Sequence, residues 1–186
     1  MSDLARLAFG GTIIDITEAR PLQRPSEGLL VPANSRAVMG AGLAGEVRLR
    51  AGREVEDELV RHRPLDLGRA YPTGAGRLAE SGVVILAHAV IYREPGEPAR
   101  PGQDERALES ALELFEEAGA RTVTLPTLRL VGGPNPDGRT LAASLAGHLR
   151  RRSRIRHLTI AGLDTDYLRR LASDLRQLGA LPVDET

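Results

Sequence analysis

The 186-residue sequence has no cysteine, no lysine and few aromatic side chains. The lack of cysteine excludes a disulfide framework, a thiolate metal site and a cysteine nucleophile. The lack of lysine excludes Schiff-base chemistry and the phosphate-binding lysine of a Walker A loop. Phenylalanine, tyrosine and tryptophan together make up 3% of the chain, so few rings are available to stack on a ligand. These absences exclude several classes of enzyme before any motif is considered.

The chain also lacks net charge and long apolar runs. Its 25 arginines balance 25 acidic residues, so no overall field attracts nucleic acid or an anionic membrane. The longest apolar run, residues 83–90, contains His88 and is shorter than the roughly 18 residues of a membrane span. Residues 1–9 lack the apolar core of a secretory signal. We expect one cytoplasmic domain over residues 1–186, with its core from about residue 4 to 179 and with neither a membrane nor nucleic acid as partner.

Hydrophobic periodicity and turn residues predict alternating strands and helices. The predicted strands cover residues 4–9, 12–16, 28–31, 83–91, 122–125 and 158–161, and residues 70–73 form either a short strand or a loop edge. The predicted helices cover residues 47–60, 104–118, 140–152 and about 165–178. This alternation predicts a mostly parallel central sheet with helices on both faces. Ligands bind such sheets beyond the carboxyl ends of strands. The candidate segments for chemistry are therefore 15–17, 32–45 and 127–136.

The glycine-rich segment 40–45, GAGLAG, opens a predicted helix. Glycine lets the backbone approach a ligand closely, and a helix N-terminus offers free N–H groups with partial positive charge. The pattern predicts either a phosphate cradle or a tight strand-to-helix turn. It also matches the dinucleotide fingerprint G-x-G-x-x-G, but residues 32–39 separate it from the preceding strand, and Asp66 follows a helix rather than a second strand. A Rossmann oxidoreductase is therefore disfavoured.

Three other positions near strand ends carry polar or flexible residues. Asp15 either accepts a hydrogen bond from a base amine or caps a turn. Asn34 either bonds sugar hydroxyls or shapes a turn. Gly132 and Gly133 form either a second phosphate clamp or an ordinary surface loop.

The histidines do not form a recognisable metal or catalytic motif. His62, His88, His148 and His157 lack metal-ligand spacing with a carboxylate, so we expect no metal and no cofactor. His88 lies inside an apolar strand, which favours a buried structural histidine over a general base. The basic segment 148–157 is favoured as a cationic helix end that complements the helix dipole, rather than as a nucleic-acid contact.

Taken together, the ordered segments resemble the macro domain family. The resemblance rests on GTIIDIT (11–17), LLVPANS (29–35), MGAGLAGEVRLRAG (39–52), HAVI (88–91), TLPTLRLVGGPNP (124–136) and residues 160–167. It extends from about residue 4 to 179 and implies an α/β fold, a three-layer α/β/α sandwich with a mixed, mostly parallel central sheet. It further implies an ADP-ribose cleft at the carboxyl ends of the strands.

The resemblance also assigns roles to individual residues. Asp15 resembles the acid that accepts the adenine amine, Ile16 contributes backbone beside it, and Asn34 resembles the asparagine that bonds the distal ribose. The first diphosphate loop corresponds to Gly40, Ala41, Gly42, Leu43, Ala44 and Gly45, and the second to Arg129, Leu130, Val131, Gly132, Gly133 and Asn135. Leu163 stands where the family places a base-stacking aromatic ring.

Several positions depart from the family pattern. The family's NAAN is VPAN at residues 31–34, and Ala44 replaces the aspartate of one hydrolytic branch. Arg129 is a new cation that faces either the diphosphate or solvent. The resemblance therefore implies first the binding of ADP-ribose or an ADP-ribosylated molecule. The alternatives are a hydrolase that releases ADP-ribose from an ester or phosphate derivative, with its catalytic residues unidentified, and a divergent fold that has lost ADP-ribose binding.

Overall fold

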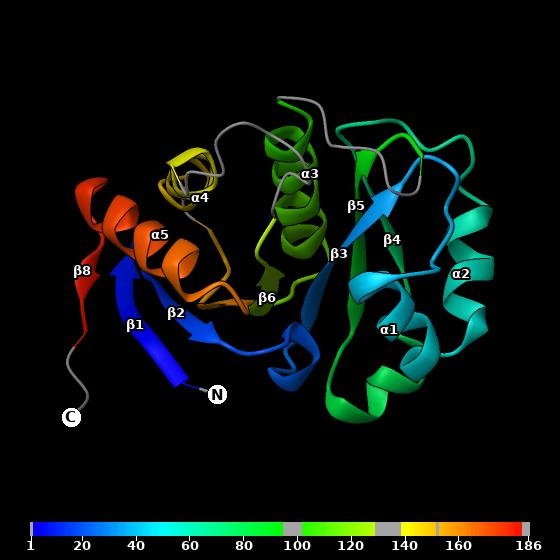
Figure 1. Cartoon of the computed structure of the whole chain (residues 1–186), viewed down its shortest axis with the longest axis horizontal. Coiled ribbons are helices and arrows are strands. Elements are labelled where there is room, and N and C mark those ends of the chain that lie inside the picture. The colour runs from blue at the N-terminus through cyan, green and yellow to red at the C-terminus, as the bar shows by residue number, and fades with distance from the viewer. Residues whose placement is uncertain (1, 95–101, 129–138, 152, 184–186) are drawn as a thin grey trace.

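The computed structural model describes residues 2–94, 102–128, 139–151 and 153–183 (Figure 1). Its strands are β1 (Ser2–Phe9), β2 (Thr12–Glu18), β3 (Gly28–Asn34), β4 (Ala70–Thr73), β5 (Ile85–Tyr92), β6 (Thr122–Pro126), β7 (His157–Gly162) and β8 (Leu181–Pro182). Its α-helices are α1 (Gly42–Ala51), α2 (Arg53–Val60), α3 (Gln103–Glu117), α4 (Arg139–Leu149) and α5 (Thr165–Gln177). The short 3-10 helices are η1 (Pro21–Gln23) and η2 (Gly76–Ser81). Among these helices, none is both long and apolar enough to cross a membrane.

All eight strands form one sheet in the order β4-β5-β3-β6-β7-β2-β1-β8. The central pairs β5–β3, β3–β6, β6–β7 and β7–β2 are parallel. The outer pairs β4–β5, β2–β1 and β1–β8 are antiparallel. The prediction of a mixed, mostly parallel sheet is confirmed. Parallel neighbours bring the carboxyl ends of β2, β7 and β6 to the same edge of the sheet, where the candidate site lies.

Helices cover both faces of the sheet, but unequally (Figure 1). The helices α3, α4 and α5 pack over one face, and Phe115 of α3 is fully buried in the larger core. The helices α1 and α2 cover the opposite face, where Val47 and Leu59 pack with alternate residues of β3 and β5. Strands β3 and β5 are therefore buried on both faces, which explains their nearly continuous apolar sequences. The predicted three-layer sandwich is confirmed.

The second face of β2 is only partly covered. Side chains alternate along a strand, so Ile14 and Ile16 point into the larger core while Asp15 points to the opposite face. There Asp15 lies near Arg6 of β1 and His157 of β7. This half of the sheet carries a polar, partly exposed face because α1 and α2 pack mainly against β3, β4 and β5.

The predicted end of β3 at Pro32 is wrong, because the strand continues to Asn34. Proline lacks the N–H that a strand donates to its neighbour. Here β3 pairs with β5 along its whole length, but its pairing with β6 covers only Gly28 and Leu29. Beyond Leu29, the edge of β3 that faces β6 forms no strand-to-strand hydrogen bonds. Pro32, which lacks an N–H group, therefore fits in this part of the strand without the loss of a hydrogen bond to β6.

The single predicted helix over residues 47–60 is also wrong. The chain forms two helices, α1 and α2, separated by Gly52. Gly52 has φ 115°, a conformation that favours glycine and ends an α-helix, and its amide donates to the Arg48 carbonyl oxygen at 3.1 Å. The apolar four-residue repeat continues across this break, so periodicity alone did not reveal it.

Candidate functional site

A cleft of about 430 Å³ opens at the carboxyl ends of β2, β6 and β7 and at the start of α1. It is lined by Ala19, Arg20, Pro21, Gly42, Leu43, Glu46, Pro126, Thr127, Ala161, Gly162, Leu163 and Asp164. This is the edge of the sheet at which α/β proteins bind small molecules. The volume falls within the range of about 300–1,000 Å³ that ligand pockets occupy.

One wall of the cleft is the N-terminus of α1. Ala41 occupies the N-cap position with φ −150° and ψ 170°, and its methyl group provides no capping oxygen. The first turn contains no acidic residue, so the helix dipole there is not offset by a carboxylate of its own turn. Because the first N–H groups of a helix have no intrahelical acceptor, this turn offers donors to a ligand beside Gly42 and Leu43.

Two glycines of this loop have conformational reasons to be there. Gly42 has φ 57°, which favours glycine, and it is exposed beside the cleft. A Cβ on Gly45 would lie 3.2 Å from the carbonyl carbon of Gly40, closer than an ordinary contact. The loop therefore folds back on itself tightly before α1 begins.

The floor of the cleft is formed where the strand ends converge. The Thr127 amide donates to the Ala161 carbonyl oxygen at 3.1 Å, and the Ala19 amide donates to the Gly162 carbonyl oxygen at 3.0 Å. A Cβ on Gly162 would lie 2.4 Å from Cγ2 of Thr127. Glycine is required at this position because β6 and β7 approach each other so closely at their ends.

An ion pair lies at the mouth of the cleft. Arg20 Nη1 is 2.8 Å from Glu46 Oε1, and the two side chains are 57% and 33% exposed. Arg20 is the only cation among the described residues that line the cleft. The remaining lining carboxylate, Asp164, accepts from the Tyr167 amide at 3.0 Å and caps α5. The cleft therefore contains one accessible guanidinium beside the donors of α1.

The structure brings three of the predicted site residues together in the cleft. Gly42 and Leu43 line it from α1, and Leu163 lines it from the turn that follows β7. Leu163 is 65% exposed, although leucine is strongly apolar. Gly40 and Ala41 are exposed next to this wall, while Ala44 and Gly45 are partly buried within the loop and the first turn.

Asp15 and Ile16 lie elsewhere. Asp15 precedes the last residue of β2, Glu18, by three residues, or about 10 Å of extended strand. Its Oδ2 accepts from His157 Nε2 at 2.6 Å, and its Oδ1 is 3.7 Å from Arg6 Nε. The side chain of Ile16 is fully buried in the larger core. Neither residue is among those that line the cleft.

Asn34 holds the turn that follows β3. Its Oδ1 accepts from the amides of Arg36 and Val38 at 3.1 and 3.2 Å, and its Nδ2 donates to the Val38 carbonyl oxygen at 2.8 Å. Asn34 is 8% exposed. The carboxamide therefore shapes the segment that leads into the glycine loop. The predicted second loop, Arg129, Leu130, Val131, Gly132, Gly133 and Asn135, lies outside the described residues.

Sequence reasoning missed Arg20 and Glu46. Arg20 was overlooked because β2 was expected to end at Ile16, whereas it extends to Glu18 and carries the cleft edge two residues further. Glu46 lies one helical turn after Gly42, on the side of α1 that faces the cleft. The polar residues at positions 17, 18 and 20 were the available indication that β2 extends beyond Ile16 and that the cleft lies at its end.

His88 is a buried structural residue, as predicted. Its ring is fully buried and Nε2 lies 2.8 Å from Thr73 Oγ1. Because the Thr73 hydroxyl donates to the Gly74 carbonyl oxygen, it accepts from Nε2–H, which leaves His88 Nδ1 as an unpaired acceptor. Burial, with a smaller contribution from His62, lowers the pKa of His88 to about 3. Within the described ranges, no group of three or more histidines or carboxylates is arranged to hold a metal ion.

The family model for the macro domain matches residues 31–133. The chain belongs to the macro domain family. Macro domains are a family that binds ADP-ribose, and the cleft of this chain lies at the carboxyl ends of three of its central strands.

Sequence relatives of this macro domain include two uncharacterized proteins. An uncharacterized protein of Aquifex aeolicus (strain VF5) is 37% identical over 103 residues, which are 55% of this chain and 61% of that protein. The match thus spans less than two thirds of the Aquifex protein. An uncharacterized protein of Aeropyrum pernix is 29% identical over 164 residues, which are 88% of this chain and 82% of that protein.

Solved macrodomains share the fold at low sequence identity. The Oceanobacillus iheyensis macrodomain with ADP has a TM-score of 0.76 at 16% identity, over 93% of this chain and 95% of that one. The macrodomain of Mycobacterium tuberculosis DarG has a TM-score of 0.67 at 17% identity, over 80% of this chain and 97% of that one. A variant of the Oceanobacillus protein was solved with ADP-ribose, at a TM-score of 0.73.

Proposed function

We propose that this macro domain binds ADP-ribose, or a molecule that carries it, in the cleft between α1 and the ends of β2, β6 and β7. The observation that carries the proposal is the uncapped N-terminus of α1, which lines the cleft through Gly42 and Leu43. Such a terminus is a general site for phosphate groups. The complexes of the Oceanobacillus macrodomain with ADP and ADP-ribose support the choice of ligand.

The diphosphate is proposed to lie against the first turn of α1, within reach of Arg20. Arg20 pairs with Glu46 at the mouth of the cleft, and both side chains are accessible to solvent. A diphosphate competes with Glu46 for the guanidinium and forms charge-assisted hydrogen bonds with it. Glu46 then acts as an opposing charge, so its removal is expected to strengthen binding.

The adenine is proposed to lie beside Leu163 and the segment 19–21, which line the same cleft. The prediction that Asp15 accepts the adenine amine stays untested. The Asp15 carboxylate accepts from His157 on the partly covered face of the sheet, so its contact with a base in the cleft would require a rearrangement of β2 or of this hydrogen bond. A substitution of Asp15 separates the two arrangements.

The test is calorimetric titration of the purified protein with ADP-ribose, with AMP and NAD as comparison ligands. We expect saturable binding of ADP-ribose in the micromolar range, weaker in Arg20→Ala and tighter in Glu46→Gln. Asp15→Asn is expected to retain binding within about threefold if the base lies beside segment 19–21. An absence of heat at millimolar ADP-ribose would show that this chain has lost the family's ligand. Assay of the same samples for ADP-ribose released from an ester or phosphate derivative tests the hydrolase alternative.

A further inference from the structure

A second cavity, of about 320 Å³, lies on the other side of η1 from the cleft. It is bounded by η1, η2, the carboxyl end of α1 and the start of β3. Among the described lining residues, Pro21 is the only one that it shares with the cleft. We call it the arginine pocket, after Arg24, Arg50 and Arg77, which line it. It has no role in the ADP-ribose site proposed above.

The floor of the arginine pocket is apolar. Leu29, Leu78 and Val83 line it, and each is less than 10% exposed within the core beneath α1 and α2. Leu22, packed against the same core, adds an apolar wall from η1. A ligand that enters this pocket must therefore present an apolar body to these four side chains.

The three arginines differ in how far their donors are already used. Arg77 is held by the end of α1, since its Nε and Nη2 donate to the carbonyl oxygens of Arg50 and Leu49 at 3.2 and 3.1 Å. The Arg50 side chain has no hydrogen-bond or ion-pair partner in the described part of the chain. Among the described residues, Arg50 is therefore an unpaired cation beside the apolar floor of the pocket.

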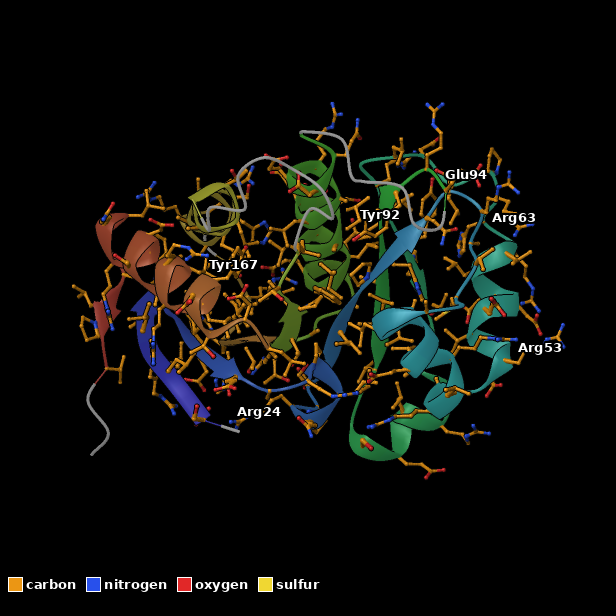
Figure 2. The ribbon with its side chains drawn as sticks, viewed as in Figure 1. Arg24, Arg53, Arg63, Tyr92, Glu94 and Tyr167 are labelled. Atoms are coloured by element: carbon orange, nitrogen blue, oxygen red, sulfur yellow. The ribbon has the colours of Figure 1, made fainter. Side chains whose placement is uncertain are left out.

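The Arg24 guanidinium uses only some of its N–H donors in hydrogen bonds to described residues. Its Nη2 donates to Asp3 Oδ1 at 2.5 Å and to Thr17 Oγ1 at 3.2 Å (Figure 2 labels Arg24 beside η1). Its Nε is buried without a hydrogen-bond partner among the described residues. The Arg24 side chain is 31% exposed, so part of its guanidinium is accessible from the pocket.

The charge balance of the pocket favours an anion. Three guanidinium groups line it, and the only carboxylate among its described lining residues is Glu80. Asp3 offsets part of the charge of Arg24 from outside the pocket. We infer that the arginine pocket binds a small amphipathic anion, a molecule with one aromatic or branched aliphatic body and one carboxylate or phosphate group. The body packs on the leucine and valine floor, and the acid accepts from Arg50 and from the exposed part of the Arg24 guanidinium.

The experiment uses phenyl phosphate as the probe, because it combines one ring with one phosphate. Methyl resonances of Leu22, Leu29, Leu78 and Val83 are followed by NMR during the titration. Benzyl alcohol and inorganic phosphate, titrated separately, each present only half of the proposed ligand. We expect saturable shifts of these methyls with phenyl phosphate and binding at least about tenfold weaker for either half. Equal binding of benzyl alcohol would contradict a site for an anion.

Two arginine variants then locate the site. Arg50→Ala is expected to weaken phenyl phosphate binding about tenfold, because it removes the unpaired cation beside the apolar floor. Arg53→Ala is the matched control, since Arg53 lies on α2 outside the pocket with its side chain 78% exposed (Figure 2). Equal losses in both variants would reveal only non-specific attraction and overturn the inference.

A steric variant and a competition complete the test. Ser81 is an exposed residue of the pocket lining, and Ser81→Phe is expected to abolish the methyl shifts without a change of charge. Saturating ADP-ribose is expected to leave phenyl phosphate binding unchanged. Displacement of the probe by ADP-ribose would place the probe in the cleft and contradict a separate site, whereas failure of ADP-ribose to bind would concern only the proposed function.

Discussion

Leu163 lies at the rim of the cleft, 65% exposed, beside the position proposed for the adenine. Stacking of a base on an aromatic side chain contributes about 1–3 kcal/mol in nucleic-acid sites, and leucine already supplies part of that contact area. We therefore predict that Leu163→Phe tightens ADP-ribose binding by about threefold to tenfold. Ribose 5-phosphate, which lacks the base, serves as the control ligand in the same calorimetric titration. An equal gain for both ligands would show that the ring acts on something other than the base.

His88 predicts how stability depends on pH. The pKa of His88 is about 3 in the folded protein and about 6.5 in the unfolded chain, so the unfolded state binds the extra proton between these values. The neutral, buried ring costs no stability above pH 6.5, and stability falls progressively as the pH decreases below it. At pH 4.5 the loss due to His88 is about 2–3 kcal/mol.

Urea unfolding between pH 7.5 and 4.5 measures this effect. The slope of the free energy of unfolding against pH measures how many protons the protein takes up on unfolding. We expect this number to be smaller by about one in His88→Leu than in the wild type on the acid side. His62→Gln changes an exposed histidine and is expected to leave the slope nearly unchanged. A slope that is the same in wild type and His88→Leu would mean that other groups control the acid response.

At this scale, the site was partly predictable from the sequence. Gly42 was identified because a glycine-rich segment at the start of a helix is a local feature, whereas Leu163 was identified only through the resemblance to the macro domain family. Asp15 was expected at the strand end, but β2 continues to Glu18 and carries Arg20 to the cleft instead. The length of a strand depends on its neighbours, here β1 and β7, which a local pattern does not include.

At the scale of elements, the N-terminus of α1 provides the cleft with N–H donors and partial positive charge. Ala41 has the extended conformation of an N-cap but no capping oxygen. We predict that Ala41→Asp stabilises the protein by about 1 kcal/mol, because the new carboxylate caps α1 and complements its dipole. The same carboxylate occupies the N–H groups proposed for the diphosphate and repels it, so ADP-ribose affinity is expected to fall at least about tenfold.

Ala41→Asn is the matched control, because asparagine caps a helix about as well as aspartate but carries no charge. It is expected to stabilise the protein similarly and to weaken binding less. Thermal unfolding and calorimetry of the two variants measure both effects. Unchanged affinity in Ala41→Asp would exclude the start of α1 from the ligand site.

Some boundaries of helices and strands could not be predicted from the sequence. Most strands and helices of the second half were predicted closely, because turn residues and apolar periodicity agree there, but the two-residue strand β8 was not predicted. The break at Gly52 was missed because apolar residues continue at four-residue intervals across it. The continuation of β3 through Pro32 was missed because only the sheet order reveals that one side of this strand is unpaired beyond Leu29.

At the scale of the whole molecule, the order of weak motifs identified the fold although no single motif was specific. The uneven helical cover was not predictable, because it follows from which strands become neighbours. That cover leaves Arg6, Asp15 and His157 together on a partly exposed face and concentrates the cleft where β2, β6 and β7 end beside α1. Polar residues that are dispersed in the sequence thus separate into two regions, and only one of them lines the cleft.

The most direct test of the central claim is an amide NMR titration of the wild-type protein with ADP-ribose. We predict saturable shifts that are largest for Gly42, Leu43, Gly162 and Leu163, because these residues line the cleft from α1 and from the end of β7. Asp15 and His157 are expected to shift little. Saturation with the largest shifts at Asp15 and His157, or no shift at millimolar ADP-ribose, would contradict the proposed site.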